Sequence, residues 1–210
     1  LHRLIRRQRQ MCIRDSPNHF GYQGAGGGPI NMLNTYFVRR VDFYAGAFPA
    51  RYGDKSSSVM DIWLREGNRE GYAGHVYLGM SGAGAMAEGP LAKGKGCWIL
   101  SARKSFLDLI ISSTGLSAVP KYYNLQGKIT YDINIKNKLL INGIYGNDKI
   151  KIENEEPEGG YSRGAENVDA LSHQYAFGAT LQTLFGKTGM SNLTLFQTKN
   201  YWNHYVYDDN

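Results

Sequence analysis

The sequence predicts an all-β fold with one antiparallel sheet of about seven long strands, and three observations indicate it. From Gly71 onward, segments of about 8 to 18 residues are separated by turns and polar loops. Hydrophobic and polar residues alternate in them with a period of two rather than 3.6. The composition, with 26 Gly, 15 Tyr and 8 Phe, suits strands with aromatic ends and tight turns. No run approaches the roughly 18 apolar residues of a membrane helix.

Turn signals set the expected bounds of the seven strands. We predict strands at residues 74–81, 83–91, 97–110, 121–134, 138–153, 168–185 and 191–207. After the first tight hairpin, short turns and longer polar loops alternate. A membrane barrel has short turns on one side and longer loops on the other, whereas a soluble sandwich does not require this alternation.

The fourth strand shows the period most clearly. One face carries the apolar set Tyr123, Leu125, Gly127, Ile129, Tyr131 and Ile133, and the other the polar set Asn124, Gln126, Lys128, Thr130 and Asp132. The segments are longer than the roughly 9 to 11 residues that a tilted strand needs to cross a bilayer, and soluble strands average about five or six. The sequence therefore predicts a partial, open transmembrane β-barrel.

Aromatic residues near the strand ends are consistent with this prediction. Tyr122, Tyr123, Tyr131 and Trp98 would fit the aromatic girdles of a membrane barrel, although they would fit a soluble β-sheet core equally well. The seventh strand alternates less cleanly, because Leu193 and Leu195 share a face with Gln197 and Lys199. We interpret the latter part of that strand as projecting above the membrane.

The formal charge of +6 suggests a nucleic-acid partner at first, but most of it lies in the first sixteen residues. Five arginines against Asp15 give this segment +4, which leaves +2 for the rest of the chain. Residues 1–16, and MCIRDS above all, resemble translated sequencing-adapter sequence, so we treat them as non-native. A genuine basic arm that contacts phosphates is the alternative. We expect no nucleic-acid partner.

The sequence shows no pattern typical of catalysis or metal binding. The histidines at 19, 75, 173 and 204 are scattered, and no GxSxG or HExxH occurs. Cys12 lies in the non-native segment, so Cys97 has no disulfide partner. Gly24–Gly28 lacks the Lys and Ser/Thr of a phosphate loop, and the acidic run Glu153–Glu158 is more typical of a solvated loop than of a cation site. We expect no cofactor, no metal and no enzyme activity.

The segment before the strands lacks this regular alternation; it contains the stretch VDFYAGAFPARYGDKSSSVMDIWLREGN, from Val41 to Asn68. It resembles the carboxyl-terminal part of the plug domain of TonB-dependent outer-membrane receptors, in their SusC-like or carboxypeptidase-regulatory-domain-bearing branch. The pattern is a short strand, a glycine turn, an [AR]-x-[YF]-G element, small residues and a last strand. The matching residues are Val41–Phe43, Gly46, Arg51–Gly53, Ser56–Ser58 and Val59–Leu64. EGPL at Glu88–Leu91 and SARKSFLDL at Ser101–Leu109 resemble the opening barrel strands, so the resemblance covers Pro17 to Asn210.

The resemblance implies a plug inside a barrel of 22 strands. Residues 17–70 would be the end of the plug and residues 71–210 the first barrel strands. Because Leu1 is not an initiator and no signal peptide appears, we expect the start to be truncated and the TonB-contacting segment to be missing. The implied function is TonB-dependent active uptake of an iron chelate, vitamin, glycan or peptide across the outer membrane. The partners would be TonB and outer-membrane lipid, and a surface lipoprotein is a further candidate partner.

Charged residues of the plug segment are the predicted plug-to-barrel contacts: Arg51, Arg65 and Glu66. A plug that fills a polar lumen would pair such groups with opposite charges on the wall. In the family, an arginine at the position of Arg51 pairs with barrel glutamates, so we hypothesise that Arg51 locks the plug; a solvated surface arginine is the alternative. Gly46, Tyr52 and Gly53 form the predicted plug turn, in which Gly53 allows positive φ.

Two other functions remain open at this point. An outer-membrane barrel enzyme would place a Ser/His or acidic cluster at its loop ends, and a β-rich surface adhesion protein would show strands of soluble length. We expect a curved open sheet with residues 21–68 packed on its concave, polar face. Tyr123, Leu125, Ile129 and Tyr131 should point away from that segment.

Overall fold

The structure is a computed structural model that describes residues 18–19, 30–45, 59–79, 82–106, 118–152, 167–186 and 189–207. In these residues the fold is all-β, as the sequence predicts, with one seven-stranded sheet and two two-stranded sheets. A short 3-10 helix, η2 (Thr35–Phe37), interrupts the strands. No helix in the described part of the chain has both the length and the apolar character needed to cross a membrane.

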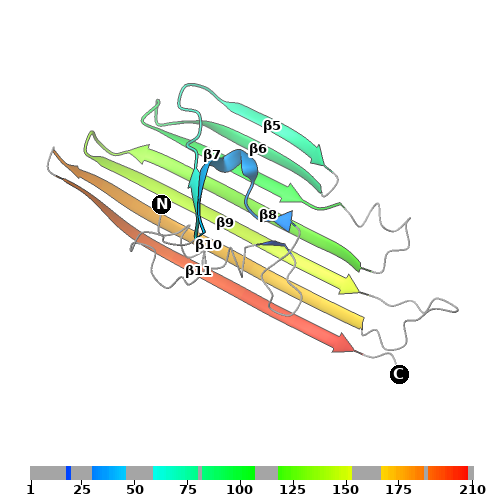
Figure 1. Cartoon of the computed structure of the whole chain (residues 1–210). Helices are drawn as coiled ribbons and strands as arrows, with labels where there is room; N and C mark the ends of the chain where they lie inside the picture. Colours follow the sequence, from blue (N-terminus) through cyan, green and yellow to red (C-terminus); the bar gives the residue numbers. More distant parts are fainter. Residues whose placement is uncertain are drawn as a thin grey trace.

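The large sheet is a meander in which every strand pairs antiparallel with its neighbour in sequence (Figure 1). β5 and β11 form its two edges and do not pair with each other, so the sheet is open. The strands are β5 (Ala73–Gly79), β6 (Gly82–Leu91), β7 (Gly96–Lys104), β8 (Ala118–Asp132), β9 (Asn137–Ile152), β10 (Asn167–Phe185) and β11 (Gly189–Tyr207).

These bounds agree with the seven predicted strands except at one loop. β7 ends at Lys104 instead of 110, and β8 begins at Ala118 instead of 121. The side chain of Ser105 explains the early end of β7, because its Oγ accepts a hydrogen bond from the backbone N of Tyr122 at 3.0 Å. The hydroxyl thereby takes the place of a backbone acceptor, and the ladder stops.

Apart from the tight β5–β6 hairpin, the connections of the sheet differ between its two ends. The turns at 92–95, 133–136 and 186–188 are short and lie at one end, whereas the connections at 105–117 and 153–166 are long and lie at the other. Asn134 builds the β8–β9 turn, because its Oδ1 accepts from the backbone N of Lys136 and of Asn137, both at 2.9 Å. The predicted alternation of short turns and long loops is confirmed.

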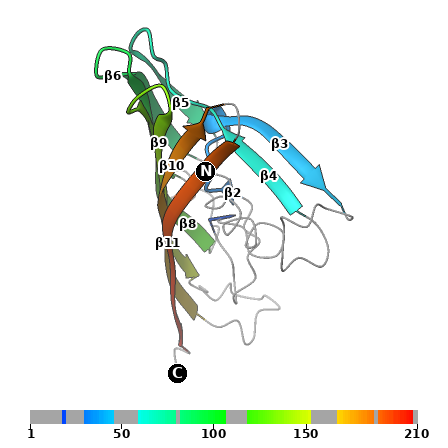
Figure 2. The same ribbon diagram turned by 90° about the vertical axis from the view of Figure 1, so that its left-hand side faces the viewer.

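The elements before β5 lie on one side of the large sheet (Figure 2). β1 (Asn18–His19) pairs with β2 (Ile30–Asn31), and β3 (Val38–Tyr44) pairs antiparallel with β4 (Val59–Leu64). The two strands predicted in the stretch that resembles a plug, Val41–Phe43 and Val59–Leu64, are both present. We refer to residues 30–45 and 59–70 as the N-terminal segment.

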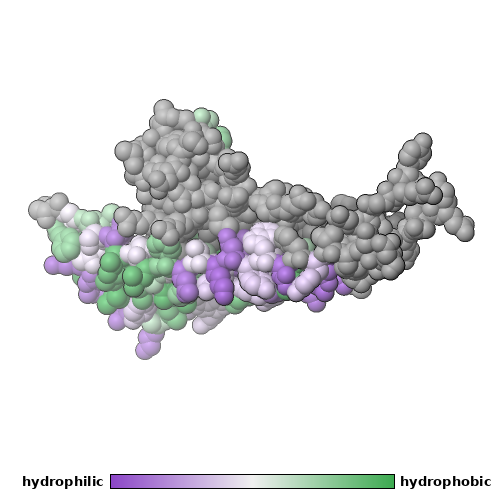
Figure 3. All heavy atoms as spheres, turned by 90° about the horizontal axis from the view of Figure 1, so that it is seen from below, coloured by the Kyte–Doolittle hydropathy of each residue, from purple (hydrophilic) through white to green (hydrophobic). Residues whose placement is uncertain are grey.

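The two faces of the sheet are opposite in character to those of a water-soluble sheet. In β8 the polar residues Asn124, Gln126 and Lys128 are buried on the face toward the N-terminal segment. On the other face Tyr123, Leu125 and Ile129 are 36 to 40% exposed. Viewed from the β11 side, hydrophobic residues gather toward the left-hand end of the visible surface, and hydrophilic residues cover much of the remainder (Figure 3). The predicted outward direction of the apolar side chains is confirmed.

Candidate functional site

The candidate site is the contact between the N-terminal segment and the polar face of the sheet. Its first anchor is Asn34, which precedes η2 and is 2% exposed. The Oδ1 of Asn34 accepts from the backbone N of Tyr36 at 3.1 Å and so caps the short helix. The Nδ2 of Asn34 donates to Ser101 Oγ at 2.6 Å and to Tyr77 Oη at 3.1 Å, and its backbone N donates to Gln126 Oε1 at 2.9 Å. One residue thus contacts three strands.

Met32 is the second anchor. Its side chain is almost fully buried and packs with Ile144 and Ala176. Its carbonyl O accepts from Arg103 Nη2 at 2.7 Å and from Asn124 Nδ2 at 2.8 Å. The absence of a side chain at Gly146 makes room for this contact, since a Cβ there would lie 2.1 Å from Met32 Cε.

Phe37, the third anchor, ends η2 and is fully buried. It packs with Met86 and Ile99 of the sheet and with Leu64 of β4. The carbonyl O of Phe37 accepts from the backbone N of Arg65 at 2.8 Å, which continues the pairing of β3 and β4 to the point where the chain leaves β4. The apolar contacts are therefore few, and polar bonds make up the rest of the site.

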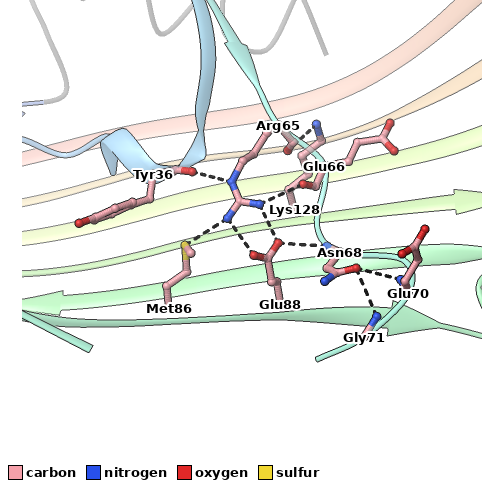
Figure 4. A network of polar contacts seen from close by, with 9 residues as sticks. All are labelled: Tyr36, Arg65, Glu66, Asn68, Glu70, Gly71, Met86, Glu88 and Lys128. Carbon is pink, nitrogen blue, oxygen red and sulfur yellow. Dashed lines mark hydrogen bonds and ion pairs between the residues drawn. The ribbon is translucent and has the colours of Figure 1, made fainter. Parts of the chain in front are cut away.

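Arg65 and Glu88 form an ion pair between the N-terminal segment and β6 (Figure 4). Arg65 Nη1 lies 2.7 Å from Glu88 Oε2 and Nη2 lies 3.1 Å from Oε1, so the pair is bidentate. The guanidinium also donates from Nε to the carbonyl O of Tyr36 at 2.7 Å. Glu88 accepts in addition from the backbone N of Asn68 at 3.0 Å. This pair ties η2, the end of β4 and the following linker to one strand.

Lys128, in the middle of β8, is 4% exposed and reaches the same part of the chain. Its Nζ donates to the carbonyl O of Leu64 at 2.8 Å and of Arg65 at 3.0 Å. A buried ammonium is costly unless hydrogen bonds and nearby negative groups compensate for its desolvation. These two carbonyls provide part of that compensation, so the N-terminal segment stabilises a charge of the sheet.

A second charged cluster lies at the short-turn end of the sheet. Arg69 Nη1 lies 2.5 Å from Asp132 Oδ2, and Arg69 Nη2 lies 3.0 Å from Glu66 Oε2. Lys138 Nζ approaches Glu66 at 3.6 Å and Asp132 at 3.7 Å. The hydrogen bond to Asp132, and then the one to Glu66, raise the pKa of Arg69. Burial alone would raise the pKa of Glu66, but the bond from Arg69 and the charge of Lys138 outweigh it and lower that pKa.

The structure describes only some of the predicted site residues. Arg65 and Glu66 both contact residues of the large sheet, as described above. Arg51, Gly46, Tyr52 and Gly53 lie outside the described residues. The sequence did not single out Asn34, Met32 or Arg69, because none stands in a recognisable pattern. Lys128 carried a weak signal, since it is the one cation on the polar face of the fourth predicted strand.

The histidines and acidic residues show no metal site in the parts of the chain that the structure describes. His75 packs against Tyr36, with ring centroids 4.4 Å apart, and His173 Nδ1 lies 2.9 Å from Asn147 Nδ2. Comparison of the chain with protein-family models, curated proteins and solved structures found no match. The geometry is that of a segment held on a polar sheet face by hydrogen bonds, ion pairs and two small apolar contacts.

Proposed function

We propose that this chain is part of a TonB-dependent receptor of the bacterial outer membrane, with residues 17–70 as the end of the plug and residues 71–210 as the first barrel strands. Its function would be the energised uptake of an iron chelate, vitamin, glycan or peptide. The observation that carries the proposal is the inverted sheet, which exposes its apolar side chains and covers its polar face with the N-terminal segment.

The exposed apolar face favours a bilayer over water. Monomeric soluble proteins rarely expose a continuous apolar patch larger than a few hundred Å². Here the outward side chains of four neighbouring strands are mostly apolar and exposed or half-exposed, including Leu100, Leu125, Ile129, Tyr145 and Phe177. A β-sandwich would need a second sheet over this face, and within the described residues no other sheet covers it.

The height of the apolar face also fits a membrane. On β8 the outward apolar residues run from Tyr123 to Tyr131. At roughly 3.3 Å per residue this is about 27 Å along the strand, and a strand tilt of about 40° reduces it to roughly 20 Å. Side chains extend that height further, so it approaches the apolar band of about 25 Å found on outer-membrane barrels.

The polar face and its anchors suit a plug that must be held and later displaced. Polar contacts around Asn34, Arg65 and Lys128 hold the N-terminal segment, and Arg51 would add the lock that the resemblance implies. Bonds of this kind can be replaced by bonds to water when the segment moves, whereas a large apolar core would resist such movement. Force from TonB would supply the energy, so the protein itself would need no cofactor.

Cysteine labelling of the complete protein in cells tests the membrane assignment. L195C places a thiol on the outward face of β11 and T198C places one on its inward face; both positions are exposed in this sheet. In a background without other reactive cysteines, we expect a bilayer-soluble maleimide but not a charged, water-soluble one to label L195C. T198C should react with the water-soluble reagent. Equal reaction of both thiols with the water-soluble reagent would exclude a membrane barrel.

A removable cross-link tests uptake. The double variant N34C/S101C is designed to join the N-terminal segment to β7 by a disulfide, because the two side chains are in contact, with Asn34 Nδ2 2.6 Å from Ser101 Oγ; loss of the free thiols shows that the bond has formed. Cells with this variant should fail to grow on the ferric chelate, cobalamin, oligosaccharide or peptide that the wild-type protein supplies, and a reductant should restore growth. N34S/S101A is the control without a disulfide. Growth of the cross-linked strain equal to wild type without reductant would contradict plug displacement.

A further inference from the structure

Two sets of contacts hold the N-terminal segment on the sheet, and they differ in chemistry. Residues 32–37 contain no charged side chain, so Met32, Asn34 and Phe37 hold them there by apolar contacts and hydrogen bonds. Residues 65–70, which we call the linker, lie between β4 and β5 and form neither helix nor strand. Four of these six residues are charged, so the linker is held by ion pairs instead.

The charged side chains of the linker reach three strands of the sheet. The pairs are Arg65 with Glu88 of β6, Arg69 with Asp132 of β8, and Glu66 with Lys138 of β9. Their side chains are 12 to 38% exposed, so water screens the pairs only in part. Hydrogen bonds to charged groups are about twice as strong as those between neutral groups. The linker therefore has stronger polar bonds to the sheet than residues 32–37 have through Asn34.

Gly67 brings the backbone of the linker against a fourth strand. A Cβ at this position would overlap the carbonyl O of Trp98 in β7, so the chain can pass this close only without a side chain. The backbone N of Asn68 donates to Glu88 Oε2 at 3.0 Å, and Asn68 Oδ1 accepts from the backbone N of Glu70 at 2.9 Å (Figure 4). The linker thus has a fixed turn of its own, seated on the sheet.

The order of these contacts along the chain matters when the N-terminal segment is pulled. A force from the amino-terminal side reaches residues 32–37 first and Arg65 last. Contacts that are spread along a chain break one after another, whereas those of the linker lie within a few residues and must break together. Lys128 strengthens the point where the linker begins, because its Nζ donates to the carbonyl O of Leu64 at 2.8 Å and of Arg65 at 3.0 Å.

We propose that the linker is a mechanical stop, which stays on the barrel wall when the preceding part of the N-terminal segment is displaced. Movement of the plug then ends at Arg65. Because Leu64 and Arg65 keep their place beside Lys128, the displaced residues return from a fixed starting point. The inference rests on the proposed function, because it needs a force on the segment and a barrel that stays in place.

Single-molecule force spectroscopy of the complete protein in a lipid bilayer tests this inference. A pull at the amino-terminal end should release residues 32–37 first and the linker in a separate force peak, before the barrel strands unfold. Arg65 follows Asn34 by 31 residues. At about 3.4 Å per extended residue, the two peaks should lie roughly 105 Å apart.

Matched variants assign the two peaks. E88Q/D132N removes the carboxylates that hold Arg65 and Arg69, and should abolish the linker peak and keep the first one. S101A/Q126A removes two acceptors of Asn34 and should weaken the first peak and keep the linker peak. E70Q, whose side chain is exposed, should change neither peak.

Three outcomes are decisive. Release of the linker together with residues 32–37 in wild type, or an unchanged linker peak in E88Q/D132N, would overturn the inference. Barrel peaks like those of wild type show that a variant has folded. If E88Q/D132N does not fold, R69Q, which removes one charge only, should still weaken the linker peak, and no weakening would overturn the inference too. Absence of barrel peaks in wild type would instead count against the membrane assignment itself.

Discussion

At the residue scale, the Arg65–Glu88 pair is a bidentate ion pair between the N-terminal segment and the sheet. The side chains are 31% and 12% exposed, so water screens the pair only in part. We expect R65A or E88A to lower the free energy of unfolding by about 1–3 kcal/mol, because each leaves a partly buried charged partner without its bonds. Denaturant midpoints in detergent, followed by circular dichroism, measure the change.

The double variant R65A/E88A measures how far the stabilising effects of Arg65 and Glu88 depend on each other. Because both changes remove the same contact, the loss in the double variant should be smaller than the sum of the two single losses. R40A is the control, since Arg40 makes its pair with Asp42 at 2.9 Å and its contact with the Trp63 ring at 4.6 Å on a more exposed surface, and its loss should stay below about 1 kcal/mol. Strictly additive losses at Arg65 and Glu88 would show that the two side chains do not depend on each other.

Glu66, which follows β4, makes the stability of the folded protein depend on pH. Its pKa in the folded protein lies below the value of 4.5 that applies when it is free, so its contribution to stability is present above pH 4.5 and is lost as the pH falls through the lower folded pKa. We expect wild type to exceed E66Q in its denaturant midpoint at neutral pH and to lose this advantage in acid. A difference that stays constant down to about pH 3 would contradict the assignment. E70Q is the control for the loss of one negative charge.

At the element scale, the sequence predicted the strands well and the docking contacts poorly. Long β-strands with one apolar face repeat their signal every second residue, so Tyr123 to Ile133 was sufficient to assign β8 and its two faces. Asn34 lies 92 residues from Gln126, and no periodic pattern joins residues so far apart. The early end of β7 depends on a single hydroxyl, that of Ser105, which sequence patterns do not distinguish from any other serine.

Apolar and polar side chains alternate along β8, so the cost of an outward arginine should depend on its depth in the membrane. I129R places a charge in the middle of the outward apolar face, which costs about 2–4 kcal/mol in a bilayer. I133R places the same charge in the β8–β9 turn, where the cost should be about 0–1 kcal/mol. Yields of folded, heat-modifiable protein in outer membranes should therefore fall for I129R and remain near wild type for I133R. Both side chains are exposed in the isolated sheet, so equal effects would contradict a bilayer around β8.

At the scale of the whole molecule, the N-terminal segment takes the place that a hydrophobic core has in a soluble sheet. The buried side chains of the polar face include Asn124, Gln126, Lys128 and Thr130, and the two apolar clusters at Met32 and Phe37 are small. Polar groups buried in this way need partners, which the segment supplies at Asn124, Gln126 and Lys128. The sheet and the segment therefore stabilise each other, and neither is expected to hold its conformation alone.

The open sheet leads to the last prediction. Among the strands that the structure describes, none pairs with the outer edges of β5 and β11, and the edge of β11 runs from Gly189 to Tyr207. A long exposed edge next to an apolar face promotes pairing between chains. We expect the 210-residue chain, refolded alone in detergent, to form oligomers in size-exclusion chromatography with light scattering, whereas the complete protein should remain a single species. A stable monomer of the 210-residue chain would show that its edges are protected and that the sheet needs no further strands.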